Sequence, residues 1–351
     1  MGIFSFLKSS DKNTKDNVLI IEEVKNLTNE AKSISFETPN DFKFEAGQFI
    51  ELSIEIDGKL ERRSYSICSG PTEPLTIGVK AVPSGKVSNW IMRNAKPGLE
   101  IHVSKPSGNF ILNPETKHIV AIAAGSGITP IVAIAKSLEK IHGKVTLIYA
   151  NKLESSIMFK DELNALTNTT IHYFLSQENK EGYLNGRIDK ENLTELLKNN
   201  LELLEADGFY LCGPEEMILQ SKETLEFFGV SNSKIHFELF KPATILKPEE
   251  SNKEQTFSGE SKVQVVLDGE SYPFNLSPTG KTILEAAEEA GADVPYSCKG
   301  GVCASCKAKV LKGDAKMDVN YTLTDKEVAE GYILTCQAHP NSEELVISFD
   351  A

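Results

Sequence analysis

The feature that most constrains this chain is a set of four cysteines near the C-terminus with the spacing C-x4-C-x2-C-x29-C, namely Cys298, Cys303, Cys306 and Cys336. The first three share one loop of small residues, whose glycines let the backbone bend closely around a bound group. Three thiolates from one loop and a fourth from far downstream is the spacing typical of a plant-type [2Fe–2S] cluster. A zinc site more often combines two C-x2-C pairs, and only one such pair is present. A disulfide framework fits poorly, because the chain has six cysteines and no secretory signal pattern. The spacing therefore predicts an iron–sulfur cluster held by these four cysteines.

Length and charge limit the number of domains, the binding partners and the location that we expect. A chain of 351 residues is expected to form two or three domains. The formal net charge of −13 argues against binding to nucleic acid or to an anionic membrane. The longest apolar stretch, Ile119 to Ala135, is interrupted by glycines and a proline, so we expect no integral membrane segment. The N-terminal apolar patch is too short for a secretory signal and its lysines follow it, which favours a cytoplasmic location.

The pattern of strands and helices changes along the chain. Residues 17–113 read as short strands separated by turn signals, which predicts an antiparallel β-barrel. Residues 114–240 alternate strand and helix, which predicts a parallel α/β sheet. Residues 241–260 are polar and contain prolines, as expected of a linker. Residues 261–351 form a last domain, in which eight lysines face fourteen acidic residues from position 262 onward, a net charge of −6. We expect this acidic surface to dock a partner protein.

Two motifs in the barrel segment point to a flavin. In Arg63-Ser64-Tyr65-Ser66, the arginine can pair with a pyrophosphate, the tyrosine can lie against the flavin ring and the serine can reach the flavin N5. Further on, Gly85-Lys86-Val87-Ser88 precedes a helix expected from Asn89, whose N-terminus would attract an anion. Each motif also has an ordinary structural interpretation, a packed strand for the first and a helix N-cap at Ser88 for the second. Their combination in this order favours the flavin.

Two turns in the α/β segment point to a nucleotide. Gly125-Ser126-Gly127-Ile-Thr129-Pro130 lies where a strand passes into a helix, although it lacks the third glycine of the dinucleotide fingerprint. Cys212-Gly213-Pro214 repeats the strand–glycine–helix arrangement. Two such turns at neighbouring strand ends would form a crevice for a nicotinamide nucleotide. Cys212 can also be interpreted as a small buried hydrophobic residue.

These motifs, together with the Phe237-Glu238-Leu-Phe240 segment, resemble those of the ferredoxin–NADP reductase superfamily over nearly the whole chain. The last domain resembles a plant-type ferredoxin, which implies an α+β β-grasp fold. The order of the domains resembles that of oxygenase reductase components, most of all the phenylacetyl-CoA epoxygenase reductase type. The resemblance implies Ser66, Cys212 and Glu238 as the catalytic residues. The cofactor-binding residues that it implies are Arg63, Ser64, Tyr65, Ser66, Val79, Lys80, Gly85, Lys86, Val87, Ser88, Gly125, Ser126, Gly127, Thr129, Asn151, Lys152, Cys212, Gly213, Pro214, Glu238 and Phe240.

The choice between NADPH and NADH rests on a few residues. An NAD site usually has an acidic residue about 20 positions after the glycine loop. Here Asn151-Lys152 is followed by Ser155, Ser156 and Lys160, a polar and basic set that suits a 2′-phosphate. Gln177 argues the other way, because NADPH-selective relatives often carry arginine at this place. NADPH is the preferred prediction, with NADH as the alternative.

The motifs together predict an NAD(P)H:acceptor oxidoreductase. Hydride would pass from NAD(P)H to FAD, and single electrons would then pass through the [2Fe–2S] cluster to an oxygenase or hydroxylase. Three alternatives remain open at this level: a diaphorase with zinc in place of the cluster, an electron carrier with an inactive reductase half, and a desaturase or soluble redox protein as acceptor.

Overall fold

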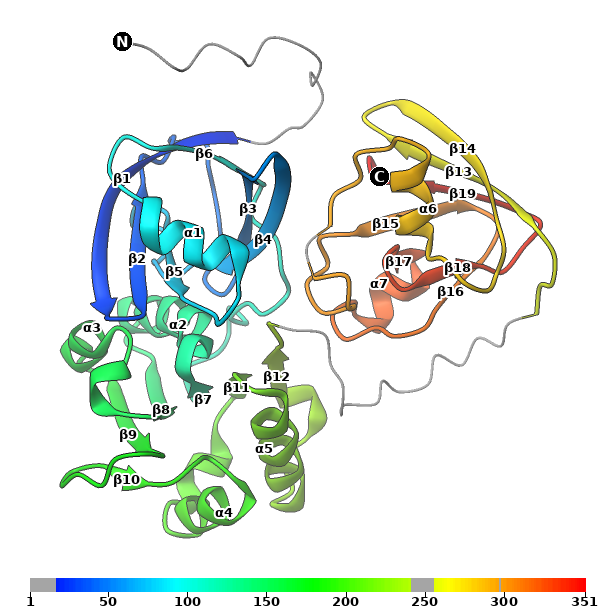
Figure 1. Cartoon of the computed structure of the whole chain (residues 1–351). Helices are drawn as coiled ribbons and strands as arrows, with labels where there is room; N and C mark the ends of the chain where they lie inside the picture. The colour runs from blue at the N-terminus through cyan, green and yellow to red at the C-terminus, as the bar shows by residue number, and fades with distance from the viewer. Residues whose placement is uncertain (1–16, 241–255, 297) are drawn as a thin grey trace, which may run out of the picture.

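The computed structural model describes residues 17–240, 256–296 and 298–351, which form three units (Figure 1). The expected N-terminal tail up to residue 16 and most of the expected linker, residues 241–255, lie outside the described residues. We call the three units the barrel, the α/β domain and the cysteine domain. Within the described ranges, no helix is both long enough and apolar enough to cross a membrane.

The barrel is an antiparallel sheet with strand order β4-β3-β6-β1-β2-β5. A bridge between Ile67, just after β4, and Ile77 in β5 joins the two outer strands and closes the sheet. Asp57 and Gly58 both have positive φ, 53° and 72°, as a tight turn between β3 and β4 requires. The elements are β1 Asn17–Thr28, β2 Ala31–Phe36, β3 Phe49–Ile56, β4 Lys59–Ser66, β5 Thr76–Lys80, α1 Lys86–Asn94 and β6 Glu100–Val103.

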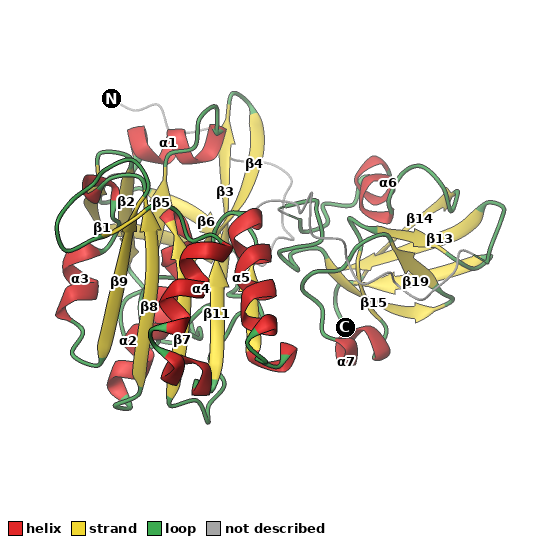
Figure 2. Ribbon diagram, turned by 90° about the horizontal axis from the view of Figure 1, so that it is seen from below, coloured by secondary structure: helices red, strands yellow, loops and turns green. Residues whose placement is uncertain are grey.

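The α/β domain is a parallel sheet with strand order β10-β9-β8-β7-β11-β12 (Figure 2). The middle strand β7 is a continuous apolar run buried on both faces, as is usual in parallel sheets. The chain leaves β7 in one direction and returns on its other side as β11, so a crevice for a ligand is expected at their carboxyl ends. The elements are β7 His118–Ala124, η1 Gly125–Gly127, α2 Ile128–Lys140, β8 Lys144–Asn151, η2 Glu154–Ser156, α3 Lys160–Ala165, β9 Thr169–Leu175, β10 Leu184–Asn185, α4 Lys190–Lys198, η3 Leu201–Glu205, β11 Gly208–Cys212, α5 Glu215–Phe227, η4 Asn232–Lys234 and β12 Ile235–Glu238.

The barrel and the α/β domain share a hydrophobic core. Ala31, Ala46 and Phe110 of the barrel belong to the same buried cluster as the apolar face of α2. A methyl group added to Gly78 in β5 would lie 2.6 Å from the Thr129 side chain at the start of α2, so only glycine allows this approach. The two domains are therefore closely packed against each other.

The cysteine domain is a mixed sheet with strand order β14-β13-β19-β15-β17, in which β13 and β19 run parallel. Helix α6 covers it and begins with a capping box between Thr282 and Glu285. This is the α+β arrangement expected for a ferredoxin. The elements are β13 Ser261–Leu267, β14 Glu270–Leu276, α6 Ile283–Glu289, β15 Lys307–Lys312, β16 Ala315–Met317, α7 Asp325–Ala329, β17 Tyr332–Leu334, β18 Ala338–Pro340 and β19 Glu344–Ser348.

Candidate functional site

The four cysteines of the last domain form two adjoining pairs of thiols. A hydrogen bond with Cys303 lowers the pKa of Cys298 to about 6, and a hydrogen bond with Cys306 lowers the pKa of Cys336. The pairs adjoin, because Cys298 acts electrostatically on Cys336 and Cys303 on Cys306. Within the described ranges, no three His, Cys, Asp or Glu side chains converge as ligands of one metal ion. Two pairs of thiolates suit a cluster of two irons, each iron taking one pair.

The backbone of the cysteine loop is shaped around the thiols. The Gly300 N–H donates to Cys298 Sγ at 3.3 Å, and the Cys298 N–H points to Cys303 Sγ at 3.5 Å. Backbone N–H groups directed at sulfur stabilise the negative charge of a bound iron–sulfur cluster. Lys299 and Ala304 both adopt positive φ, 51° and 55°, which turns the loop around its centre. The donor set and the loop therefore fit a [2Fe–2S] cluster.

Two motifs of the barrel converge on one carboxylate. Lys86 Nζ lies 2.6 Å from Glu61 Oε1, and Arg63 Nη2 lies 3.6 Å from Glu61 Oε2. Arg63 comes from the end of β4 and Lys86 from the first turn of α1, so the structure brings together two cations that are distant in the sequence. Two cations beside one carboxylate and a helix N-terminus leave net positive charge for a pyrophosphate.

The helix beside this cluster begins earlier than expected. It starts at Lys86 with Gly85 as N-cap, and not at Asn89. The alternative of Ser88 as N-cap is wrong, because Ser88 lies inside the first turn and its hydroxyl accepts a hydrogen bond from the Val82 N–H at 3.2 Å. Val79 and Val87 are buried in the barrel core.

The barrel and the α/β domain meet at a partly buried polar contact. The Ser66 hydroxyl donates to Glu238 Oε2 at 3.3 Å, joining the end of β4 to the end of β12. Glu238 is paired in register with Cys212, the last residue of the neighbouring strand β11. Burial of its carboxyl group raises the pKa of Glu238 to about 8, and burial also raises the pKa of the Cys212 thiol. Both groups are therefore neutral at pH 7, and the three predicted catalytic residues lie together.

The glycine turns of the α/β domain touch each other at the same place. A methyl group on Gly127 would lie 2.0 Å from the Cys212 carbonyl oxygen, so this approach requires glycine. Thr129 is buried, and its hydroxyl donates to the Ser126 carbonyl at 3.0 Å. Tyr65 lies on β4 and packs against the barrel core, and burial raises the pKa of its phenol. The turns lie at the carboxyl ends of β7 and β11, where a crevice for a nucleotide is expected.

A charged cluster lies beyond the end of β8. Asn151 ends β8 and is buried, and Lys152 follows it on the surface. Glu154 is bound by Lys160, by Lys180 and, at 2.6 Å, by the Tyr183 hydroxyl, and the two lysines lower the pKa of Glu154 to about 2. Lys160, expected beside a 2′-phosphate, thus pairs with an acidic residue that the sequence did not mark. Glu178 also accepts a hydrogen bond from the Glu154 N–H at 2.8 Å, so the two lysines of the cluster are balanced by two carboxylates.

The remaining predicted cofactor-binding residues lie around the sites described above. Lys80 ends β5 with its Nζ 4.0 Å from Glu30 and near Gly125. Gly213 and Pro214 lead into α5, with Pro214 at the N-cap. Phe240 is exposed at the edge of the described residues, two positions after Glu238. Glu61, Lys180 and Tyr183 were missed by sequence reasoning, because no motif spacing marks them.

The fold and these sites define a class: a flavin- and nicotinamide-dependent reductase that carries its own ferredoxin. The sequence matches three known domain families, the oxidoreductase FAD-binding domain over residues 18–111, the oxidoreductase NAD-binding domain over 121–223 and the 2Fe-2S iron-sulfur cluster binding domain over 265–341. It has the fold of phthalate dioxygenase reductase, with a TM-score of 0.59 at 23% identity over 95% of this chain and 98% of that one.

The relatives among characterised proteins belong to oxygenase systems. The chain is 36% identical to one of the subunits of 1,2-phenylacetyl-CoA epoxidase from Escherichia coli, over 95% of this chain and 97% of that protein. It is 32% identical to the ferredoxin reductase component of 3-ketosteroid-9-alpha-monooxygenase from Mycobacterium tuberculosis, over 95% of both chains. The protein belongs to this family of oxygenase reductase components. It is an NAD(P)H oxidoreductase with FAD and a [2Fe–2S] cluster, and it passes electrons to an oxygenase partner.

Proposed function

We propose that Ser66, Cys212 and Glu238 form the hydride-transfer site, where a nicotinamide in the crevice meets the flavin held by the barrel. The observation that carries this proposal is the 3.3 Å hydrogen bond between Ser66 and Glu238, made across the two domains beside Cys212. A flavin holds zero, one or two electrons and so converts a hydride into the single electrons that an iron–sulfur cluster accepts.

The residues of the chain have distinct roles in this proposal. Glu238 is protonated below about pH 8, so it places a neutral group, not an anion, beside the flavin. Ser66 fixes the orientation of this carboxyl group through their hydrogen bond. The buried thiol of Cys212 and the tight turn at Gly127 exclude water from the crevice. Tyr65 would cover the flavin ring, and Arg63, Lys86 and the first turn of α1 would hold the pyrophosphate.

We also propose that NADPH is the preferred nucleotide. Lys152 is exposed directly after β8, whereas Lys160 and Lys180 beyond it are matched by carboxylates. A 2′-phosphate is a strong acceptor for such ammonium groups.

The proposal also covers the organisation of the chain. Its domain limits are 17–113, 114–240 and 261–351, with a linker at 241–260, and its location is cytoplasmic. An oxygenase similar to the phenylacetyl-CoA epoxidase would be the acceptor.

Anaerobic stopped-flow mixing of the holoenzyme with NADPH tests the hydride-transfer site. Cys212→Ala and Ser66→Ala should each slow flavin bleaching by about tenfold or more at saturating nucleotide, because small errors in position at the reacting atoms are costly. The matched control is Cys68→Ala, since Cys68 is equally buried but its thiol donates to the Thr76 carbonyl within the barrel. Flavin bleaching that is as fast in the Cys212 and Ser66 variants as in the control would overturn the proposal.

A further inference from the structure

Arg62 lies just outside the flavin motif, on the face of β4 opposite to Arg63 and Tyr65. It precedes Arg63 on β4 and is paired in register with Ser53, whereas Arg63 is paired with Leu52. Neighbouring residues of a strand point to opposite faces, so Arg62 shares the face of Glu51 and Ser53. The side chain of Arg62 is only 10% exposed although it carries a full charge. Such a buried charge needs a partner.

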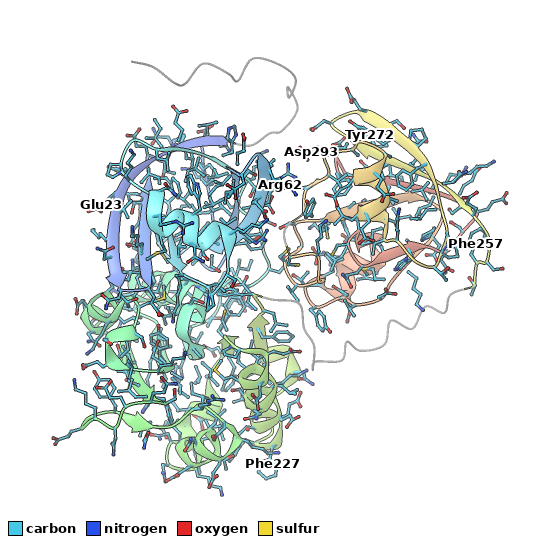
Figure 3. All side chains as sticks on the ribbon, in the orientation of Figure 1. Glu23, Arg62, Phe227, Phe257, Tyr272 and Asp293 are labelled. Atoms are coloured by element: carbon cyan, nitrogen blue, oxygen red, sulfur yellow. The ribbon has the colours of Figure 1, made fainter. Side chains whose placement is uncertain are left out.

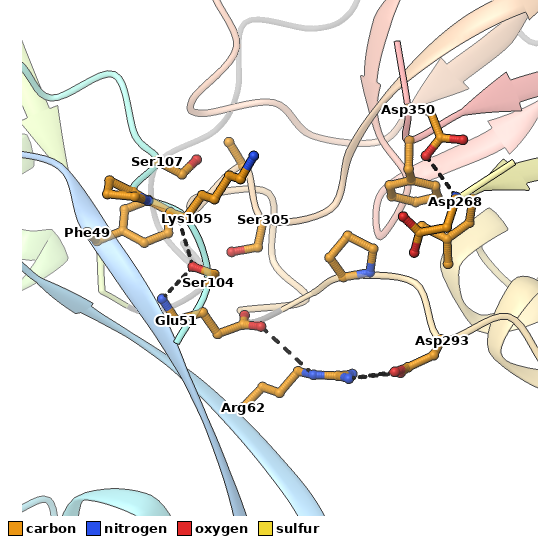
Figure 4. Close-up of a pocket in the computed structure, with 15 residues that line it drawn as sticks. Phe49, Glu51, Arg62, Ser104, Lys105, Ser107, Asp268, Asp293, Ser305 and Asp350 are labelled. Carbon is orange, nitrogen blue, oxygen red and sulfur yellow. Dashed lines mark hydrogen bonds and ion pairs between the residues drawn. The ribbon is translucent and has the colours of Figure 1, made fainter. Parts of the chain in front are cut away.

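That partner belongs to the cysteine domain. Arg62 Nη2 lies 2.9 Å from both carboxylate oxygens of Asp293, while its Nε lies 3.9 Å from Glu51 (Figures 3 and 4). The guanidinium also lies 5.9 Å from the ring of Tyr296. Asp293 comes five positions before Cys298, the first cysteine of the cluster loop. The Arg62–Asp293 ion pair therefore holds the chain immediately before the cysteine loop.

Two further contacts hold the cysteine domain near the same place. Val302, within the cysteine loop, packs into the buried cluster formed by the α/β domain, and Cys298 and Tyr321 contact that cluster as well. Asn109 of the barrel donates to the Thr322 carbonyl at 3.1 Å and to Glu327 Oε2 at 3.2 Å. The cluster loop is therefore placed against the junction of the barrel and the α/β domain.

The interface around Arg62 is loosely packed. A cavity of about 460 Å³ separates the barrel from the cysteine domain and is lined on one side by Phe49, Glu51 and Ser104, and on the other by Asp268, Ser305 and Asp350 (Figure 4). Because few atoms touch across this gap, apolar packing alone does not fix the angle between the two domains. The Arg62–Asp293 pair spans one side of the cavity and is well placed to set that angle.

We propose that Arg62 is a positioning residue for electron transfer from the flavin to the cluster. Its pair with Asp293 holds the cysteine domain so that the cluster loop faces the flavin. The inference rests on the proposed function, since it takes the junction at Ser66 and Glu238 as the place where the hydride arrives. Each hydride delivers two electrons, and the cluster accepts one at a time. The pose held by Arg62 must therefore serve two successive transfers, with the first electron leaving to the acceptor before the second follows.

Charge reversal across the pair tests the proposal in the holoenzyme. The variants are Arg62→Glu, Asp293→Arg and the double exchange, with Arg93→Glu as a matched control on an exposed arginine of the same barrel. Asp293→Asn serves as a milder variant, because Asp293 is half exposed and the amide keeps the size of the carboxylate. Flavin and iron contents are measured first in every variant. Flavin bleaching and cluster bleaching are then followed separately after anaerobic mixing with NADPH, and hydrogen–deuterium exchange is measured over residues 292–306.

Arg62→Glu should slow cluster bleaching by about tenfold or more and raise exchange over residues 292–306, while flavin bleaching stays within about twofold of the wild type. Asp293→Asn should show the same changes at smaller size, and the double exchange should recover most of the lost rate. Cluster bleaching and exchange in Arg62→Glu equal to those of Arg93→Glu would overturn the proposal, as would a double exchange with no recovery. A failure of the proposed function is distinguishable, since it would appear in flavin bleaching of the Cys212 and Ser66 variants.

Discussion

The barrel meets its two neighbours in different ways. Toward the α/β domain it shares a hydrophobic core, and a methyl group on Gly78 would lie only 2.6 Å from the Thr129 side chain. Toward the cysteine domain it offers an ion pair between Arg62 and Asp293, a few polar contacts and a cavity of about 460 Å³. The first interface resembles the interior of a protein, and the second resembles a transient contact between domains.

The difference corresponds to the two kinds of transfer. Hydride transfer requires the reacting atoms to be in contact and aligned, so the crevice between the barrel and the α/β domain must be rigid. A single electron passes between groups that do not touch, and the cluster must also face an external partner. A looser contact, whose orientation the Arg62–Asp293 pair helps to set, is sufficient there. The predictions below act on one interface or the other.

The largest effect is expected when the cluster, from which electrons leave the protein, loses a ligand. Cys336→Ser should lower cytochrome c reduction by more than about 100-fold, because one iron of the cluster loses a thiolate, while reduction of two-electron dyes continues. Cys68→Ser is the control, since its thiol hydrogen-bonds to the Thr76 carbonyl within the barrel. Steady-state assays with both acceptors measure the ratio. Cytochrome c reduction that survives in Cys336→Ser would contradict the route through the cysteine domain.

The next effect concerns the close contact in the crevice. Gly127→Ala should slow flavin reduction by NADPH by about 100-fold, because the added methyl would lie 2.0 Å from the Cys212 carbonyl oxygen and must displace the turn. Stopped-flow flavin bleaching measures this. The same variant reduced chemically by dithionite should still pass electrons to cytochrome c at the normal rate. If both rates fall together, the effect of the substitution is not confined to the crevice.

A moderate effect is expected from pH. Ionisation of Glu238 above its pKa of about 8 places an anion beside the group that accepts hydride, which disfavours the transfer. The limiting rate of flavin bleaching should therefore be steady from pH 6 to 7 and fall by up to about tenfold as the pH rises through 8. In Glu238→Gln the fall should vanish. An equal fall in the wild type and in this variant would assign the ionisation to another group.

The smallest effect concerns the choice of nucleotide. Lys152→Ala should raise the KM for NADPH by about fivefold and leave the KM for NADH unchanged, as expected for the loss of one exposed ammonium–phosphate contact. Lys198→Ala, an exposed lysine at the end of α4, is the matched control. A larger change in KM for NADH than for NADPH would favour the NADH alternative.

Motifs within a short stretch of chain could be predicted from the sequence. The cysteine spacing and the two glycine turns each depend on local backbone geometry. The sequence therefore indicated the local structure around each of these motifs. The parallel sheet followed from apolar runs such as His118–Ala124, which the structure shows buried on both faces. The resemblance to oxygenase reductases then gave the order of the domains and the cofactors, which the comparisons confirmed.

Contacts between distant parts of the chain could not be predicted in this way. Arg62 and Asp293 are 231 positions apart, and nothing in the sequence separates Arg62 from the neighbouring Arg63 of the flavin motif. The binding of Lys160 and Lys180 by Glu154 likewise depends on how β9 and the following loop lie beside η2. Ser88 was a plausible N-cap only as long as the start of α1 was unknown.

The most direct test of the contrast between the two interfaces is the salt dependence of the two transfers in the wild-type holoenzyme. With saturating NADPH under anaerobic conditions, flavin bleaching and cluster bleaching are followed separately at about 0.05 M and about 0.5 M NaCl, which moves the Debye length from above 10 Å to below 5 Å. We predict that the limiting rate of flavin bleaching stays constant and that cluster bleaching slows by about threefold or more. Cluster bleaching that is as indifferent to salt as flavin bleaching would contradict this contrast.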